Sequence, residues 1–496
     1  MLFNSLPFLM FFPVCVCALF MIPGKWRPAF LLAASYFFYM SWKPEYLFLI
    51  LIATLSAYYL GLKIAAQRHP GRRKALLAAA LCVNLGMLFG FKYFNFFSAQ
   101  TDALFRRCGL SWDIPVLTVL LPVGISFFTF QAVGYVIDVY RGDVEPERRL
   151  GIFALFISFF PQLVAGPIER SRNLLPQFLR KTGPDPARFT DGLRLMLWGY
   201  FKKIAVADNL SPFVDKIYAA PQDFTGLQLI IATYFFTLQI YCDFSGYTDI
   251  ARGAARIMGY DLMPNFRRPY FAASMEEFWK RWHISLSTWF RDYVYIPLGG
   301  NRRGERRRIL NLAAVFLLSG LWHGANWTFV AWGALHCAYI MCSLWTRAAA
   351  RRLHGLSMFR ILAGPGRLVK IFFTFHLVAF AWIFFRAGSM SDALYIVTHL
   401  GANLGGSADI LLRYGPVALL KSVFSFGAGV ETINAMAAIL SAGILLAVEA
   451  ATARFNAKNI LDNAPAYARW AAYYAVAFWI IVFGSFGDKS FIYFQF

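Results

Sequence analysis

The sequence predicts an all-α polytopic membrane protein. Of its 496 residues, 59% are hydrophobic and only 15% are charged, and the mean hydropathy is +0.52. Apolar segments in this proportion cannot all be buried in a water-soluble core. The basic residues cluster in short segments between apolar runs. We expect about eleven transmembrane helices in one domain, residues 1–496, because no segment has the composition of a separate soluble domain.

Charge and cysteine content argue against two other classes of protein. A formal net charge of +22 could indicate a protein that binds nucleic acid. However, the Lys and Arg residues lie between apolar runs, as the positive-inside rule predicts for cytoplasmic loops. We therefore expect membrane lipid and no nucleic acid as a partner. The seven cysteines include no C-x-x-C pair, which argues against a disulfide framework or a zinc site, so no metal is expected.

The first apolar run, Leu6–Met21, is predicted to be an uncleaved span with the N-terminus outside. No basic residue precedes it and no small-residue cleavage signature follows it, whereas Lys25 and Arg27 come directly after it. The next expected spans are residues 30–42, 46–64 and 76–91. The basic segment 68–74 should then be cytoplasmic.

Two later apolar segments contain interruptions. After a polar link, residues 98–113, the stretch 114–140 contains Leu-Pro-Val-Gly at 121–124, and because proline removes a backbone donor we expect a kink there. Segment 151–166 has arginines on both flanks, and one crossing cannot keep both flanks inside. A re-entrant segment that turns at Pro161 and Gly166 explains this pattern, and so does unequal weighting of the flanks.

The middle of the chain mixes charged and aromatic residues. Residues 188–208, with Lys202 and Lys203, predict an amphipathic or interfacial helix. The apolar run 227–242 ends beside Asp243 and Asp249, which suit acid/base chemistry, although capping and ion pairing with Arg252 or Arg256 is the expected role. Ser274 and Glu277 form a capping-box pattern that starts a helix. This helix, residues 274–301, contains His283 among tryptophans and charges, a mixture typical of the headgroup level.

The run that organises the chain, residues 309–345, has no charged residue but carries His323. As one helix it would be roughly 55 Å long, against a hydrocarbon core of about 30 Å. Gly320, Gly324 and Asn326 are the natural place for a break. A titratable group at membrane depth indicates function, and the alternative is a neutral histidine packed between helices. His336 lies on another face, and we expect it to be structural.

The remaining spans are predicted at residues 371–385, 416–424, 433–450 and 471–483, with a basic loop, 347–370, inside and segment 401–406 outside. Arg72, Arg303 and Arg352 should then all face the cytoplasm. The sequence has no glycine-rich phosphate loop, nucleophile elbow or H-E-x-x-H motif.

Several motifs together resemble those of the membrane-bound O-acyltransferase family. They are residues 121–128 (LPVGISFF), 160–163 (FPQL) with 166–167 (GP), 239–249 (QIYCDFSGYTD), 282–283 (WH) to 291–292 (RD), 320–324 (GLWHG), Trp382 with 385–386 (FR), and 491–496 (FIYFQF). They span most of the chain, and the signature region is about 239–345. Within the family, these motifs are similar to those of a bacterial branch. That branch includes the membrane subunits of alginate and peptidoglycan O-acetylation and the D-alanyl transfer protein of teichoic acids.

The resemblance implies a ring of tilted helices, with re-entrant and interfacial helices, around a site reached from both sides of the bacterial cytoplasmic membrane. It implies that His323 is the catalytic general base and His283 its polar partner. The donor would be acetyl-CoA or another thioester, with no tightly bound cofactor. It also implies a partner, either an extracytoplasmic acyltransferase of the SGNH type or a small membrane protein, that completes transfer to alginate-like exopolysaccharide or peptidoglycan.

The candidate substrate-binding residues are Trp322, Asn326, Asp243 and Arg291. Donors to a developing oxyanion would be Asn326, Trp322 or His283. The basic surface at 302–308 suits a phosphate-bearing donor, or equally lipid headgroups. Two other functions stay open: a transporter or flippase of a lipid-linked sugar or acyl carrier, in which the histidines would relay protons, and a scaffold subunit with an inactive site.

Overall fold

The computed structural model describes residues 1–110, 116–118, 121–180, 182–353, 366–424, 430–454, 462–487 and 491–492, and within these ranges it contains helices and no strand. Seven of these helical segments are long and apolar enough to cross a membrane: Pro44–Ala66, Pro70–Arg107, Gly226–Ile257, Trp327–Thr346, Arg367–Arg386, Ala435–Thr452 and Ala466–Phe483. The prediction of an all-α polytopic membrane protein is confirmed. The number of crossings stays a prediction.

The N-terminal helices begin and end near the predicted bounds. They are α1 (Leu6–Met21), α2 (Arg27–Met40), α3 (Leu47–Ala66), α4 (Pro70–Leu88) and α5 (Phe94–Arg107). A π-helical turn, Phe89–Tyr93, joins α4 to α5. The polar link predicted from residue 98 is wrong over the described part, because the helix continues to Arg107 with an Asp102–Arg106 ion pair one turn apart.

The interrupted segments are short helices in the structure. They are α6 (Ile125–Arg141), α7 (Leu150–Ser158), α8 (Phe160–Leu163) and α9 (Ser171–Phe178). The expected kink at Pro122 is instead a helix start, because Gly124 has a left-handed φ of 78° and α6 begins after it. At nine residues, α7 is about 13 Å long. It is too short to cross the hydrocarbon core, in agreement with a re-entrant segment.

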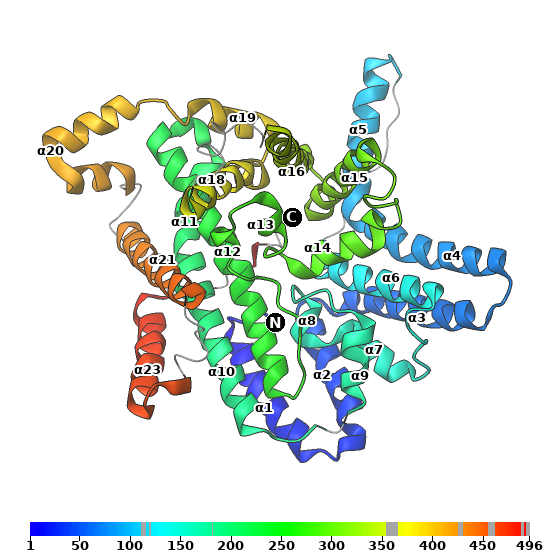
Figure 1. The fold of residues 1–496 in the computed structure, drawn as a ribbon. Coiled ribbons are helices and arrows are strands. Elements are labelled where there is room, and N and C mark those ends of the chain that lie inside the picture. The colour runs from blue at the N-terminus through cyan, green and yellow to red at the C-terminus, as the bar shows by residue number, and fades with distance from the viewer. Residues whose placement is uncertain are drawn as a thin grey trace.

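The central helices are α10 (Pro186–Tyr200), α11 (Asp208–Ala219) and α12 (Gly226–Ile257), with a π-helical stretch, Phe201–Ala207, between α10 and α11. In the middle of the molecule, α12 packs against α10, α11 and α18 (Figure 1). The interfacial position predicted for Lys202 and Lys203 is wrong. Both side chains are buried because they pair with carboxylates, Lys202 with Asp249 at 2.5 Å and Lys203 with Asp243 at 2.6 Å.

The helix predicted from Ser274 is interrupted. Its parts are α13 (Met275–Trp279), α14 (Ile284–Phe290) and a π-helical turn, Arg291–Tyr295. Ser274 caps α13 as predicted, because its hydroxyl accepts the N–H of Glu277 at 3.2 Å. Trp282 and His283 are enclosed by protein and only 1% exposed, so these two side chains do not contact lipid headgroups. The headgroup level predicted for this helix stays a prediction.

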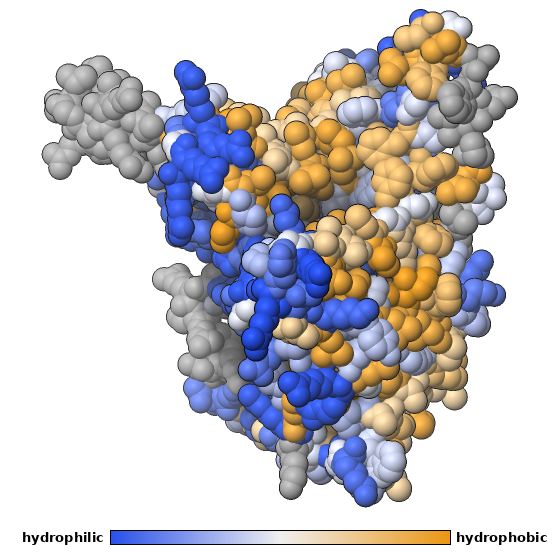
Figure 2. Space-filling model, turned by 90° about the vertical axis from the view of Figure 1, so that its right-hand side faces the viewer, coloured by the Kyte–Doolittle hydropathy of each residue, from blue (hydrophilic) through white to orange (hydrophobic). Residues whose placement is uncertain are grey.

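The remaining helices complete the fold. They are α15 (Glu305–His323), α16 (Trp327–Leu353), α18 (Arg367–Arg386), α19 (Met390–His399), α20 (Leu404–Phe424), α21 (Val430–Arg454) and α23 (Ala466–Phe483). In Figure 1, α3–α7 lie to the right of α12 and α20–α23 to its left. Large apolar side chains are exposed on helices at both ends of the chain, including Leu9 on α1 and Ile481 on α23. Figure 2 shows such residues over much of one face, as expected of a surface that contacts lipid.

Candidate active site

His323 lies at the C-terminal end of α15. The chain becomes extended at Gly324 and α16 begins at Trp327, so the predicted break in the run 309–345 is confirmed. Asn326 stabilises the break: its Oδ1 accepts the N–H of Thr328 at 3.1 Å, and its Nδ2 donates to the carbonyl oxygen of Gly388 at 3.0 Å. The histidine is therefore on a helix end that its neighbours hold in place.

Aromatic rings enclose the His323 imidazole, which is 3% exposed. Its centroid lies 4.9 Å from that of Trp322, 5.0 Å from that of Trp332 and 5.0 Å from that of Phe385. All three are edge-on contacts. Such packing fixes the ring orientation, a requirement for proton transfer along one direction.

His283 lies between α13 and α14 in the left-handed region, with φ of 42°. This conformation is uncommon for a residue other than glycine and often marks a functional site. The ring is 1% exposed and packs against Phe244 at 4.7 Å. Burial lowers the pKa of His283 to about 3, so its imidazole is neutral near pH 7.

The indole of Trp322 connects the two histidines. Its centroid is 5.8 Å from that of His283 and 4.9 Å from that of His323. The fold thus brings together two residues that are 40 positions apart in the sequence. The roles predicted for His283, Trp322 and His323 stay predictions.

A small cavity, the inner cavity, borders His323. Its volume is about 30 Å³, room for roughly two water molecules. Its walls come from three parts of the chain, and the lining residues are Lys92, Leu121, Pro122, Val123, Gly124, Ile125, Ser126, Phe127, Val164, Trp322 and His323. This is where a small reacting group can contact the imidazole.

A larger cavity of about 590 Å³, the arginine-rimmed cavity, lies between α13–α14 and α15–α16. Its polar lining includes Lys280, Arg291 and Arg308, and its apolar lining includes Leu286 and Phe316. Ser319 also lines it and lies one helical turn before His323 on the same face of α15. The volume is in the range of small-molecule sites.

The four residues predicted to bind substrate lie in different places. Trp322 lines the inner cavity and Arg291 the arginine-rimmed cavity. Asn326 lines neither, and its amide is committed to the helix break. Asp243 also lines neither: its carboxylate pairs with Lys203 and accepts the N–H of Ile492 at 2.7 Å. The predicted ion pair of Asp249 with Arg252 is present at 3.4 Å.

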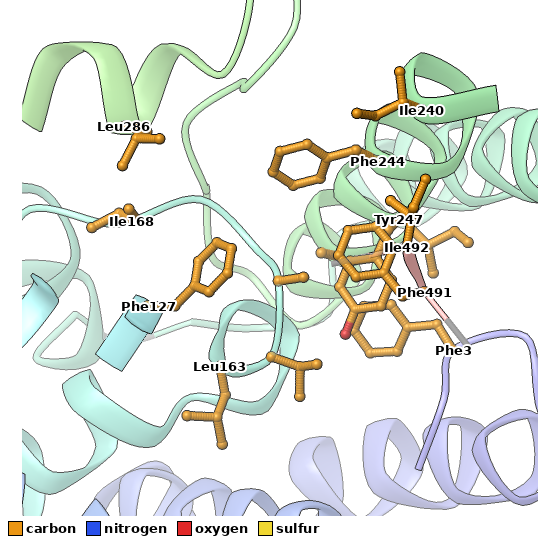
Figure 3. Close-up of a cluster of buried hydrophobic side chains, with 14 of the residues drawn as sticks. Phe3, Phe127, Leu163, Ile168, Ile240, Phe244, Tyr247, Leu286, Phe491 and Ile492 are labelled. Carbon is orange, nitrogen blue, oxygen red and sulfur yellow. The ribbon is translucent and has the colours of Figure 1, made fainter. Parts of the chain in front are cut away.

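The described end of the chain, Phe491 and Ile492, is buried beside the site. The Phe491 ring lies 4.9 Å from that of Tyr247 and 5.5 Å from that of Phe244, the residue that packs on His283. Figure 3 shows these side chains gathered with Phe3 at the same place. The rest of the predicted terminal motif, residues 493–496, lies outside the described residues.

His336 is fully buried, and its ring packs against those of Trp279 at 4.9 Å and Trp332 at 4.8 Å. It lines neither cavity, which agrees with the structural role predicted for it. Among the described residues, no three His, Cys, Asp or Glu side chains gather where they could hold a metal ion.

Sequence reasoning missed Lys92. Its Nζ donates to the carbonyl oxygens of Trp322 at 2.7 Å and His323 at 2.9 Å. A signal was present, because Lys92 is the single charged residue between Lys74 and Asp102, and a charge within an apolar helix indicates function.

Comparison with known proteins identifies the family of this chain. Residues 149–385 match the membrane-bound O-acyltransferase family. A probable alginate O-acetylase, AlgI, of Pseudomonas putida is 41% identical over 79% of this chain and 79% of its own length. The chain belongs to the membrane-bound O-acyltransferase family. A peptidoglycan O-acetyltransferase of Helicobacter pylori is 34% identical over 76% of this chain and 73% of its own length.

More distant members of the membrane-bound O-acyltransferase family include a teichoic acid D-alanyltransferase of Bacillus subtilis, 27% identical over 53% of this chain and 68% of its own length. The resemblance inferred from the motifs is therefore confirmed. The protein is an integral membrane acyltransferase, which decides against the transporter alternative.

Proposed function

We propose that this membrane O-acyltransferase moves an acetyl group from a thioester donor to a hydroxyl group, with His323 as the general base. The observation that carries the proposal is the position of His323, which lines the inner cavity, while Ser319 one turn away lines the arginine-rimmed cavity. His323 thus borders one cavity and lies one helical turn from a residue that lines the other. The O-acetylase names of the similar proteins support acetyl as the acyl group.

In the proposed mechanism, the neutral imidazole of His323 takes the proton of the acceptor hydroxyl as its oxygen attacks the thioester carbonyl. Collapse of the tetrahedral intermediate then breaks the C–S bond, and the imidazolium returns the proton to the leaving thiolate. The small volume of the inner cavity, about 30 Å³, supports a short acyl group. The enclosing aromatic rings leave little space around His323 for water, which would hydrolyse the thioester.

We assign the thioester donor to the arginine-rimmed cavity. Lys280, Arg291 and Arg308 on its lining suit the phosphates of acetyl-CoA or of another phosphate-bearing thioester, and its apolar wall suits the carrier arm. Replacing Arg291 or Arg308 by Met should raise KM for acetyl-CoA about tenfold and change kcat little. Arg307, which does not line the cavity, is the matched control. Unchanged KM values in both variants would reject this donor site.

The donor side is expected to be cytoplasmic, because Arg308 belongs to the basic segment that contains Arg303. Met1 is expected outside, on the same side as Ser41, whose hydroxyl accepts from the Met1 amino group at 2.8 Å. An impermeant thiol reagent applied to intact cells should label a cysteine placed at residue 2 and spare one placed at 72 or 303. Labelling at 72 or 303 from outside would reverse this topology.

We propose an extracytoplasmic polysaccharide, alginate-like or peptidoglycan, as the final acceptor, by analogy with the named relatives. A partner, either an extracytoplasmic acyltransferase or a small membrane protein, would complete the transfer. The experiment deletes the gene in the native host and measures polymer O-acetyl groups. Their loss, and recovery with the wild-type chain, is the expected result. Undiminished O-acetylation of every extracytoplasmic polymer in the deletion strain would contradict the proposed function.

A further inference from the structure

One wall of the inner cavity that His323 lines is the N-terminal end of α6. Gly124 immediately precedes this 17-residue helix, and Gly124, Ile125, Ser126 and Phe127 all line the cavity. The first N–H groups of a helix carry partial positive charge. At this end of α6, the N–H of Ile125 donates to the carbonyl oxygen of Pro122 at 3.2 Å and that of Phe127 to Gly124 at 2.9 Å, so among the described residues the Ser126 N–H is the one left for a ligand. A Cβ at Gly124 would lie 2.6 Å from the carbonyl oxygen of Leu163, so only glycine permits this close approach.

Ser126 gives a second, independent indication of a polar ligand. The residue is only 8% exposed and lines the inner cavity. Its hydroxyl has no hydrogen-bond partner among the residues that the structure describes. Because a buried hydroxyl without a partner costs free energy, a polar ligand in the inner cavity that forms a hydrogen bond with the Ser126 hydroxyl would be stabilised there.

Lys92 completes the wall. It comes from the π-helical turn Phe89–Tyr93, a deviation that is frequent at functional sites. A protonated lysine has three N–H donors, and two of them bind the carbonyl oxygens of Trp322 and His323. Lys92 also lines the inner cavity, and no described residue accepts its third N–H. Lys92 therefore borders the same space as His323.

We propose that Lys92, the Ser126 hydroxyl and the Ser126 N–H at the start of α6 form the oxyanion site of the acyl transfer. The proposal rests on the proposed function. When the acceptor oxygen forms its bond to the thioester carbon, the carbonyl π electrons move to the carbonyl oxygen, and the acceptor proton passes to His323. The resulting oxyanion is stabilised by these donors. It then reforms the carbonyl as the C–S bond breaks and the thiolate takes the proton from His323.

This assignment replaces Asn326 among the donors suggested by sequence alone. The Asn326 side-chain amide donates to the carbonyl oxygen of Gly388, and Asn326 does not line the inner cavity. The inner cavity is also too small for a sugar or a phosphate, but it fits a carbonyl group.

A purely structural role for Lys92 makes a different prediction. Tyr93, its neighbour, also holds the end of α15, because its hydroxyl donates to the carbonyl oxygen of Leu321 at 2.9 Å. Tyr93 does not line the inner cavity. Tyr93→Phe therefore removes a clamp on α15 without removing a group from the cavity, and it is the matched control for Lys92→Met. Thr129→Val, on the same helix but away from the cavity, is the matched control for Ser126→Ala.

The test measures transfer of radiolabelled acetyl groups from acetyl-CoA in membranes of the native host lacking its chromosomal copy. Rates are normalised to the amount of inserted protein. We expect Lys92→Met to lower kcat about 100-fold or more and Ser126→Ala about tenfold, with KM for acetyl-CoA within twofold of wild type. Tyr93→Phe and Thr129→Val should keep kcat within about threefold of wild type.

Equal losses in Lys92→Met and Tyr93→Phe would show that Lys92 only clamps α15, and native kcat in Lys92→Met would also overturn the proposal. His323→Gln in the same membranes separates this result from failure of the proposed function. If His323→Gln is inactive while Lys92→Met is active, the oxyanion assignment alone fails. If both are fully active, the proposed function fails too.

Discussion

Ile492 donates its main-chain N–H to the Asp243 carboxylate across 2.7 Å, although the two residues are 249 positions apart. The same carboxylate pairs with Lys203, which also pairs with Asp208 at 2.8 Å. All three side chains are almost fully buried. One lysine thus holds two carboxylates, and one of these carboxylates holds the tail of the chain beside the site.

Lys203→Met should therefore destabilise the protein strongly. It leaves two buried carboxylates without their cation, at a cost of about 3–5 kcal/mol. Thermal unfolding in detergent measures the loss. Lys216→Met, at an exposed position on α11, should change stability by less than about 0.5 kcal/mol. Adding Asp208→Asn and Asp243→Asn to Lys203→Met should recover part of the stability, and no recovery would argue against the charge explanation.

Close packing of α15 on α16 should be essential for activity. A Cβ at Gly320 would lie 2.2 Å from the carbonyl oxygen of Phe329, and one at Gly333 would lie 2.3 Å from that of Phe316. Gly320→Ala or Gly333→Ala must push the helices apart and displace His323, and a displacement of 1 Å can cost about 100-fold in rate. Gly86→Ala on α4, where no atom lies within 4 Å of the added Cβ, is the control. Native rates of acetyl transfer in both Gly320→Ala and Gly333→Ala would show that close packing of α15 on α16 is not essential for activity.

The backbone of His283 gives a way to separate its chemical role from its structural one. His283→Gly and His283→Ala both remove the imidazole, so both should lower acetyl transfer to the same extent. Glycine accepts the φ of 42° without strain, whereas alanine does not. The glycine variant should therefore be more stable by about 1 kcal/mol. Thermal unfolding and transfer rate measured together check this, and native turnover in the glycine variant would remove His283 from the mechanism.

Sequence patterns predicted the helices and the break at His323 well. The break could be predicted because residues 309–345 contain no charge and, as one helix, would be longer than the hydrocarbon core is thick. The glycines around His323 then marked its position. The irregular backbone segments could not be predicted from these patterns. Nothing local marks the π-helical turns at Phe89–Tyr93, Phe201–Ala207 and Arg291–Tyr295, although each carries charged residues.

The positions of charged side chains were the main errors. Lys202 and Lys203 look interfacial by sequence because a lysine pair is costly in a protein interior. Their carboxylate partners come from α11 and α12, and such long-range pairing cannot be read from one segment. The joining of His283 to His323 through Trp322 likewise depends on packing between distant elements. The motifs predicted these residues as a set, but not their contacts.

The central claim is that His323 is the general base, and the rate of acetyl transfer in His323→Gln tests it most directly. The glutamine keeps a polar side chain of similar size but cannot accept a proton near neutral pH. His376→Gln, at a half-buried position on α18 that lines neither cavity, is the matched control. In host membranes supplied with radiolabelled acetyl-CoA, we expect inserted His323→Gln to lose at least about 1,000-fold in kcat while His376→Gln keeps the native rate. Near-native transfer by His323→Gln would contradict the account.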